Sequence, residues 1–82
     1  MKSVLWDGVA PKKMLNVLKD SKGVVWLASN TDLYYFDSGT FYPLKTAQRL
    51  NKTNITIADI CLVNNTLWTI VNSSEIFIFD IF

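Results

Sequence analysis

The sequence contains no histidine and a single cysteine, Cys61. These two features exclude a histidine-dependent catalytic triad, a disulfide within the chain and a zinc site of the usual cysteine–histidine kind. Cys61 lies in the apolar run Ala58–Val63, and this setting predicts a buried, unreactive side chain. Because no glycine-rich loop precedes a helix, a phosphate-binding loop is not indicated either.

Charge of either sign is scarce and nearly balanced, with eight basic and seven acidic residues. A nucleic-acid-binding protein shows a basic excess gathered on one face. The only local concentration is Lys12, Lys13, Lys19 and Lys22, which we interpret as a solvated face, so no nucleic-acid partner is expected. The carboxylates fall mostly at turns and strand ends, where turn capping explains them more simply than a glycosidase pair. We therefore expect a protein that is not an enzyme and has no cofactor or metal.

Long apolar runs are also absent. None approaches the roughly 18 residues that a membrane-spanning helix requires, so no membrane span is predicted. The start of the chain shows no secretory signal pattern, because the apolar stretch Val4–Trp6 ends at Asp7. Half of the 82 residues are nevertheless apolar and 13% are aromatic, which is typical of a chain that folds around a core. We expect a single small domain over residues 1–82.

Short runs rich in β-branched and aromatic residues alternate with turn residues along the chain. These runs predict strands at 2–6, 14–19, 24–28, 33–37 and 41–44, and again at 55–63, 66–71 and 75–79. Pro43 marks the fifth run as an edge strand. The polar segment 45–54 is expected to be a connecting loop, with room for a helical turn. Segment 14–19 also fits helical spacing after Pro11, and the second half of the chain is needed to decide between helix and strand.

An internal repeat decides that question. Trp68 follows Trp26 by 42 positions, and Ile76 follows Leu33 by 43. The plain strand at 55–63 is then the equivalent of 14–19, which is therefore predicted to be a strand as well. A repeat of 40–50 residues with four short strands is the signature of a propeller blade.

We therefore predict an all-β fold of antiparallel four-stranded meanders, arranged as two β-propeller-like blades at 9–44 and 55–82. The second blade lacks its fourth strand in the sequence, and residues 2–6 are the candidate for an exchanged outer strand. Because two blades cannot curve far enough for this strand to reach the second blade of its own chain, another copy is expected to satisfy the edge in a dimer or a closed ring. Trp26 and Trp68 fall at equivalent positions and are expected in the core between blades.

The first unit resembles the two-component-regulator propeller repeat of bacterial sensor proteins. Its matching positions are Gly8-Val9, Val17-Leu18, Asp20, Gly23, Val25-Trp26-Leu27, Leu33 and Phe36-Asp37. The second unit keeps Ile60, Leu67-Trp68, Ile76 and Phe79-Asp80 but lacks the turn glycine. In both units an acidic residue, Asp32 or Glu75, stands where the repeat has glycine.

The resemblance implies the ligand-sensing, extracytoplasmic region of a hybrid two-component sensor. It thereby implies a periplasmic location, an oligosaccharide ligand and a role in signal transduction. The chain is about two blades long, whereas propellers typically close with four to eight. The resemblance is therefore that of a fragment of such a sensor or of a small self-assembling relative.

Trp6 and Tyr42 are the candidate ligand-binding residues, because exposed aromatic rings on edge segments can stack on a sugar. Covering the edge of a blade is the simpler structural role for both. The alternative function is a small structural or interaction module that self-associates through exposed strand edges, since an unpaired apolar edge recruits other chains.

Overall fold

The computed structural model describes residues 2–80, and Met1, Ile81 and Phe82 lie outside the described residues. The described part is mostly β, as predicted, with one short helix. Its elements are β1 (Leu5–Trp6), β2 (Met14–Lys19), β3 (Val25–Ser29), β4 (Leu33–Asp37), β5 (Thr40–Pro43), α1 (Thr46–Arg49), β6 (Ile57–Val63), β7 (Thr66–Val71) and β8 (Glu75–Asp80). Among residues 2–80, no helix is long and apolar enough to cross a membrane. The last two residues of the predicted second blade cannot be compared, because they lie outside this range.

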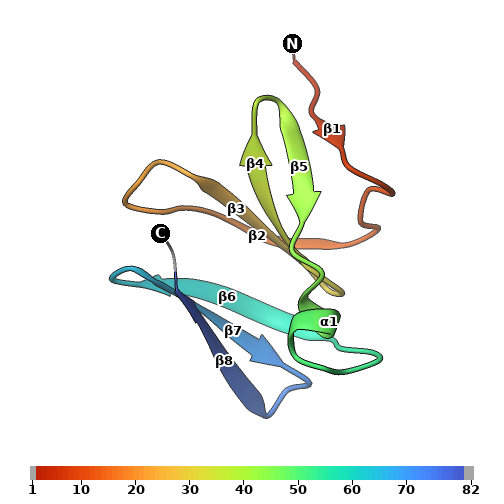
Figure 1. Cartoon of the computed structure of the whole chain (residues 1–82), viewed down its shortest axis with the longest axis vertical. Helices are drawn as coiled ribbons and strands as arrows, with labels where there is room; N and C mark the ends of the chain where they lie inside the picture. The colour runs from red at the N-terminus through yellow and green to blue at the C-terminus, as the bar shows by residue number, and fades with distance from the viewer. Residues whose placement is uncertain (1, 81–82) are drawn as a thin grey trace.

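The strands form two sheets that face each other (Figure 1). In the first, β2, β3, β4 and β5 make an antiparallel meander, and β1 adds to β5 in parallel, which gives the order β1-β5-β4-β3-β2. The second is antiparallel and consists of β6, β7 and β8. The single turn of α1 connects the two sheets.

The predicted strand arrangement needs a correction. The first sheet is mixed and five-stranded and the second is three-stranded, so the described residues form neither two antiparallel four-stranded meanders nor a propeller. Within the chain, Leu5 and Trp6 pair with Thr40 and Phe41 of β5 instead of serving the second sheet. β5 was predicted to be an edge strand, but β1 covers its outer edge at Thr40 and Phe41. Pro43 lies beyond the part of β5 that pairs with β1. The physical reason is packing, because Trp6 lies against the buried rings of Phe41 and Tyr34 when β1 pairs with β5.

Residues with positive φ make the tight turns that join these strands. Ser38 (φ 50°) and Gly39 (φ 87°) form the two-residue turn between β4 and β5, which is the geometry that follows the twist of a hairpin. Asn64 (φ 54°) begins the two-residue turn between β6 and β7. Asparagine adopts this conformation more readily than most residues, so a turn without glycine forms here.

The two halves of the chain share details that the sequence repeat alone does not show. We call Met14–Pro43 the first unit and Ile57–Asp80 the second unit. The first strand of each has a register irregularity, just before Asn16 in β2 and just before Asp59 in β6. The side-chain oxygen of Asn16 accepts the next amide at 2.9 Å, and that of Asp59 accepts the next amide at 2.8 Å. The same bulge therefore recurs at equivalent positions of both units.

Cross-strand pairing fixes which residues share a face, because neighbours across a ladder point to the same side. The tryptophan face of the first unit holds Asn16, Leu18, Trp26, Ala28, Leu33, Tyr35 and Tyr42. The equivalent face of the second unit, called the open face below, holds Asp59, Cys61, Trp68, Ile70, Ile76 and Ile78. The other side of the first unit, called the arm face, holds Val17, Val25, Leu27, Tyr34, Phe36 and Phe41. The other side of the second unit, called the inner face, holds Ile57, Ile60, Leu62, Leu67, Thr69, Val71, Phe77 and Phe79.

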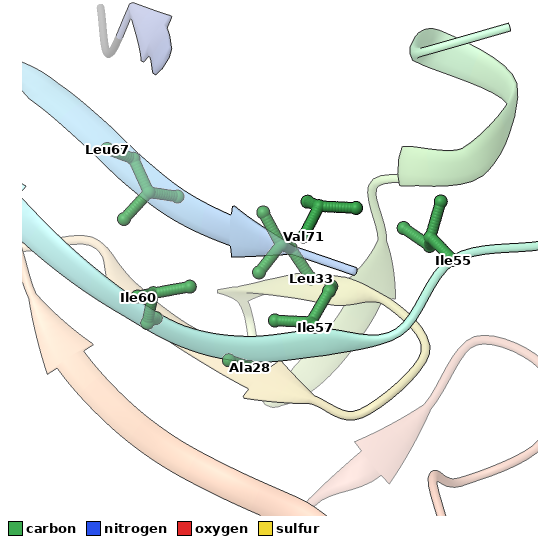
Figure 2. Close-up of a cluster of buried hydrophobic side chains, with 7 residues drawn as sticks. All are labelled: Ala28, Leu33, Ile55, Ile57, Ile60, Leu67 and Val71. Atoms are coloured by element: carbon green, nitrogen blue, oxygen red, sulfur yellow. The ribbon is translucent and has the colours of Figure 1, made fainter. Parts of the chain in front are cut away.

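The main core lies between the tryptophan face of the first unit and the inner face of the second (Figure 2). Its buried members are Ala28, Leu33, Ile55, Ile57, Ile60, Leu67 and Val71. Trp26 packs against this cluster, as predicted for a residue between the units. The two units are therefore joined by one directional contact, in which a tryptophan face packs on an inner face.

Asp32 fixes the connection between the units. Its Oδ1 accepts hydrogen bonds from the amide and hydroxyl of Thr46, at 2.9 and 2.7 Å, and from the amide of Leu33 at 2.8 Å. Thr46 is fully buried at the start of α1. The carboxylate at this position therefore has a structural task that the glycine of the propeller repeat could not perform.

Candidate functional site

Hydrogen bonds to Asp20 connect three motif residues at the turn between β2 and β3. The amide of Gly23 donates to the Asp20 carbonyl at 3.1 Å, and Trp26 donates to the Asp20 side chain. Asp20 is 7% exposed, and its carboxylate accepts the indole Nε1–H of Trp26 at 2.9 Å and the amides of Lys22 and Val24 at 2.8 and 3.0 Å. Burial raises the pKa of Asp20, but the hydrogen bonds from Trp26, Val24 and Lys22 and the charge of Lys22 together hold this pKa below its ordinary value. The spacing of these residues is therefore explained by turn structure without a ligand.

In the second unit, the indole N–H of the tryptophan has a different hydrogen-bond acceptor. The indole Nε1–H of Trp68 donates to the Thr66 hydroxyl at 2.8 Å, and that hydroxyl donates to the carbonyl of Val63 at 2.6 Å. Thr66 thus takes the place of Asp20 as acceptor. The shorter turn explains why the second unit keeps its tryptophan without the aspartate and glycine.

Trp6 lies in an aromatic cluster on the arm face. Its ring is stacked on Phe41 with centroids 4.9 Å apart and meets Tyr34 edge-on at 5.3 Å. Tyr34 and Phe41 are buried, and Leu27 completes the cluster. The structure therefore places Trp6 as a half-buried cover on the first sheet.

Tyr42 lies on the other side of the same sheet, so the structure does not bring the two candidate residues together. Its ring is stacked on Tyr35 at 5.5 Å, and Tyr35 lies 6.1 Å from Trp26. The three half-buried rings form a row across β3, β4 and β5, which we call the aromatic row. Alternation along β5 places Tyr42 opposite to Phe41, but the sequence has no signal that places Trp6 on the side of Phe41.

The open face of the second unit is an apolar surface that the core leaves uncovered. Ile70, Ile76 and Ile78 are 38%, 59% and 52% exposed. A shallow hollow of about 140 Å³ lies on this face and is lined by Asp59, Ile60, Cys61, Trp68, Ile70 and Ile76. Exposed apolar patches of this kind mark interaction surfaces in soluble proteins.

Two sequence predictions fail on this face. Cys61 was expected to be buried, but its side chain is exposed. Trp68 was expected in the core between units, but it is half-buried and lines the open hollow. Both errors have one cause, since no sheet among residues 2–80 packs against the tryptophan face of the second unit.

Equivalent residues of the two units have opposite environments. Ala28 and Leu33 on the first tryptophan face are fully buried, whereas their equivalents Ile70 and Ile76 are exposed to water. The first tryptophan face is covered by the inner face of the second unit, and the open face has no such cover in the described chain. The open face is therefore the candidate functional site. The sequence held no signal for it, because the equivalent positions of both units are apolar.

The open face carries few polar groups among the described residues. Within residues 2–80, no group of three or more histidine, cysteine or acidic residues is placed to hold a metal ion. Two carboxylates lie on this side of the second sheet, Asp59 on β6 and Asp80 at the end of β8. Asp59 already accepts the amide of Ile60 at 2.8 Å and the Asn16 side-chain amide at 3.5 Å. The open face is therefore an apolar surface with polar groups at its edge.

Comparisons of the chain with protein-family models, with curated proteins and with solved structures give no match.

Proposed function

We propose that the chain is a non-enzymatic interaction module whose open face binds a β-sheet of another unit. One observation carries this proposal: the repeat-equivalent face of the first unit is already buried under a sheet, while the open face is not. Two structural repeats that share the same bulge and the same tryptophan are expected to pack in the same way. The occupant of the open face should then resemble the inner face, which is mainly apolar.

The finer interpretation is that the two units are propeller-like blades. Each unit is a short antiparallel meander, and the contact between them runs from a tryptophan face to an inner face, an arrangement that further units can extend. The resemblance to the two-component-regulator propeller repeat supports this interpretation. In such an array the third unit would cover Trp68 and Cys61.

A chain lengthened by a third unit tests this function. Residues 45–80 are repeated after residue 82 of the chain, with serine in place of the second copy of Cys61. We expect the reaction of Cys61 with a thiol reagent to slow by about tenfold or more, because a covered thiol reacts only on local opening. The urea midpoint of unfolding should rise as well, since more apolar surface is buried.

The matched control is the same three-unit chain with Ile76→Lys in its second unit, which places a charge in the proposed contact. This variant should return Cys61 to the reactivity of the natural chain. An unchanged Cys61 rate in the three-unit chain, with the third unit folded by circular dichroism, would contradict the proposal.

A second candidate function is the ligand sensing that the resemblance implies, with a periplasmic sensor and an oligosaccharide ligand. The aromatic row favours it, because three half-buried rings in line can stack against sugar rings. Trp26 packs against the core at one end of the row, and Tyr42 lies on β5 at the other end. The described residues of the second unit form no strand equivalent to β5. Trp6 would support this site only indirectly, through the packing of the first sheet.

Binding of short oligosaccharides, followed by tryptophan fluorescence, tests the second candidate. If the row is a sugar platform, Tyr42→Ala should weaken binding by about tenfold, because one lost stacking contact is worth roughly 1–1.5 kcal/mol. The control is Phe36→Ala on the arm face of the same sheet, which should leave binding unchanged. Equal loss in both variants, or no binding by the natural chain, would count against this function.

A further inference from the structure

The arm face of the first unit is the repeat equivalent of the inner face. Val17 corresponds to Ile60, Val25 to Leu67 and Tyr34 to Phe77, because each pair occupies the same place in the two ladders. Within the chain, the inner face of the second unit already packs against the tryptophan face of the first unit. One chain therefore contains both halves of a second such contact, the open face on one unit and the arm face on the other.

Part of the arm face is occupied by the N-terminal arm, residues 2–13. Trp6 covers its β4–β5 half by packing on Tyr34 and Phe41. The arm is held by a two-residue parallel pairing, with the amides of Leu5 and Asp7 donating to β5 and its preceding turn at 3.0 and 2.9 Å. The β2 side of the face stays uncovered, since Val17 is 56% exposed.

We infer that the chain binds a second copy of itself head-to-tail, with the open face of one copy on the arm face of the next, and that the arm limits this association by covering that face. This inference rests on the proposed function and names the partner of the open face. The contact between the two units supplies its geometry.

The hydrogen bonds at the edge of the contact between the two units are also compatible with the binding of a second copy. Between the units, the Asn16 amide donates to Asp59 at 3.5 Å and the Ser21 hydroxyl donates to Asn65 at 3.2 Å. In the head-to-tail arrangement, Asp59 of one copy meets Asn16 of the next. A carboxylate then faces an amide donor instead of another carboxylate, so the pairing has no like-charge penalty.

Edge-to-edge pairing, the mode expected from the sequence, is less favourable. If β8 of two copies paired antiparallel along its full length, each Glu75 would lie opposite Asp80 of the other copy. Like charges directly opposite each other destabilise a strand pair. The acidic ends of β8 therefore protect its open edge, whereas the middle of the open face carries no charge.

A head-to-tail contact is heterologous and generates rings or filaments. The position of Trp6 therefore decides the assembly state of the chain. While Trp6 stays in its cluster, the natural chain is mainly monomeric. Loss of Trp6 should expose Tyr34 and Phe41 and allow multimers to form.

Sedimentation velocity of Trp6→Ser beside Leu5→Ser tests the inference, since both residues lie in β1 but Leu5 is 67% exposed. Trp6→Ser should form species beyond the dimer at a concentration about tenfold lower than the natural chain or Leu5→Ser. Adding Ile76→Lys to Trp6→Ser should restore the monomer. The inference would be overturned if folded Trp6→Ser stays monomeric or forms only dimers. It would also be overturned if adding Ile76→Lys does not reduce the association of Trp6→Ser.

Disulfide trapping keeps the inference testable if Trp6→Ser does not fold. Inside the chain, Leu18 packs against the cluster that contains Ile60. Their equivalents are Cys61 and Val17, so the inference places Cys61 of one copy beside Val17 of the next. Mild oxidation of Val17→Cys should give a ladder of disulfide-linked trimers and tetramers, whereas Lys22→Cys, an exposed turn position, should give far weaker bands beyond the dimer. Equal ladders in both variants, or none in either, would overturn the inference.

The two proposals fail in different ways. Protection of Cys61 in the three-unit chain reports only whether the open face accepts a sheet. If Cys61 is protected there while the Val17→Cys ladder is absent, the proposed function stands and the partner is not a second copy.

Discussion

Asp20→Asn is expected to lower the free energy of unfolding by about 2–3 kcal/mol at pH 7, a large share of the 3–5 kcal/mol that a core of this size supplies. Asparagine can keep the acceptor for the amides of Lys22 and Val24, but its NH₂ group would face the indole N–H of Trp26. Two donors then meet at a buried site, and the charge that strengthened all three hydrogen bonds is lost. Urea unfolding followed by tryptophan fluorescence measures the change.

The same variant should also alter the pH dependence of stability. Because the folded pKa of Asp20 is lowered, its contribution is fully present above the unfolded pKa of about 4. This contribution is lost as the pH falls through the folded pKa. The difference in stability between the natural chain and Asp20→Asn should therefore shrink below about pH 4. A difference that persists unchanged at lower pH would show that the carboxylate charge is not the cause.

Asp37→Asn is the control, since Asp37 belongs to the same sequence motif but is exposed at the end of β4. Its carboxylate accepts only the neighbouring Ser38 hydroxyl, at 3.2 Å, among the side-chain hydrogen bonds of the described residues. This variant should change stability by less than about 0.5 kcal/mol. The two aspartates of the motif are thus expected to differ strongly in their contribution.

Most strands could be predicted because local chemistry and tertiary packing agree along β2 to β8. Turn residues able to adopt positive φ, such as Gly39 and Asn64, stand between runs of β-branched and aromatic residues. The segment of β2 was ambiguous by periodicity alone. Its comparison with β6 gave the correct assignment, because equivalent repeats share strand structure even when one of them has weak alternation.

The position of β1 could not be predicted, because a two-residue strand has no periodicity and a parallel pairing has no turn to set its register. Contacts of Trp6 with Phe41 and Tyr34 hold β1 at the edge of β5 instead. The pairing of Trp6 with Phe41 then follows from packing between segments far apart in sequence. Neither composition nor motif spacing contains this information.

The candidate site was missed for a different reason. The apolar run around Cys61 and the repeat position of Trp68 both suggested burial, and burial is the usual outcome for such residues. That expectation assumes that a covering sheet exists. The first unit has one, and the described part of the second unit does not, so identical sequence signals lead to a core in one unit and to a surface in the other.

Leu67→Ala is expected to destabilise the chain by about 3 kcal/mol, whereas Ile70→Ala on the same strand should cost less than about 1 kcal/mol. Leu67 is fully buried on the inner face, where truncation leaves a cavity between the two sheets. Ile70 is 38% exposed on the open face, so water already reaches its side chain. Urea unfolding of both variants, with far-UV circular dichroism as a check on folding, measures the contrast.

The contrast matters because both residues are large, aliphatic and only three positions apart on β7. If Ile70 served mainly to stabilise the isolated chain, the two truncations would have similar costs, and the open face would be an ordinary part of the fold. If the costs differ as expected, Ile70 adds little to folding, and its apolar side chain is better explained by a partner. In the three-unit chain the same Ile70→Ala change should then become more destabilising than in the natural chain, since the equivalent position Ala28 is fully buried once a sheet covers it. An Ile70→Ala cost that is the same in both chains would contradict the binding role of the open face.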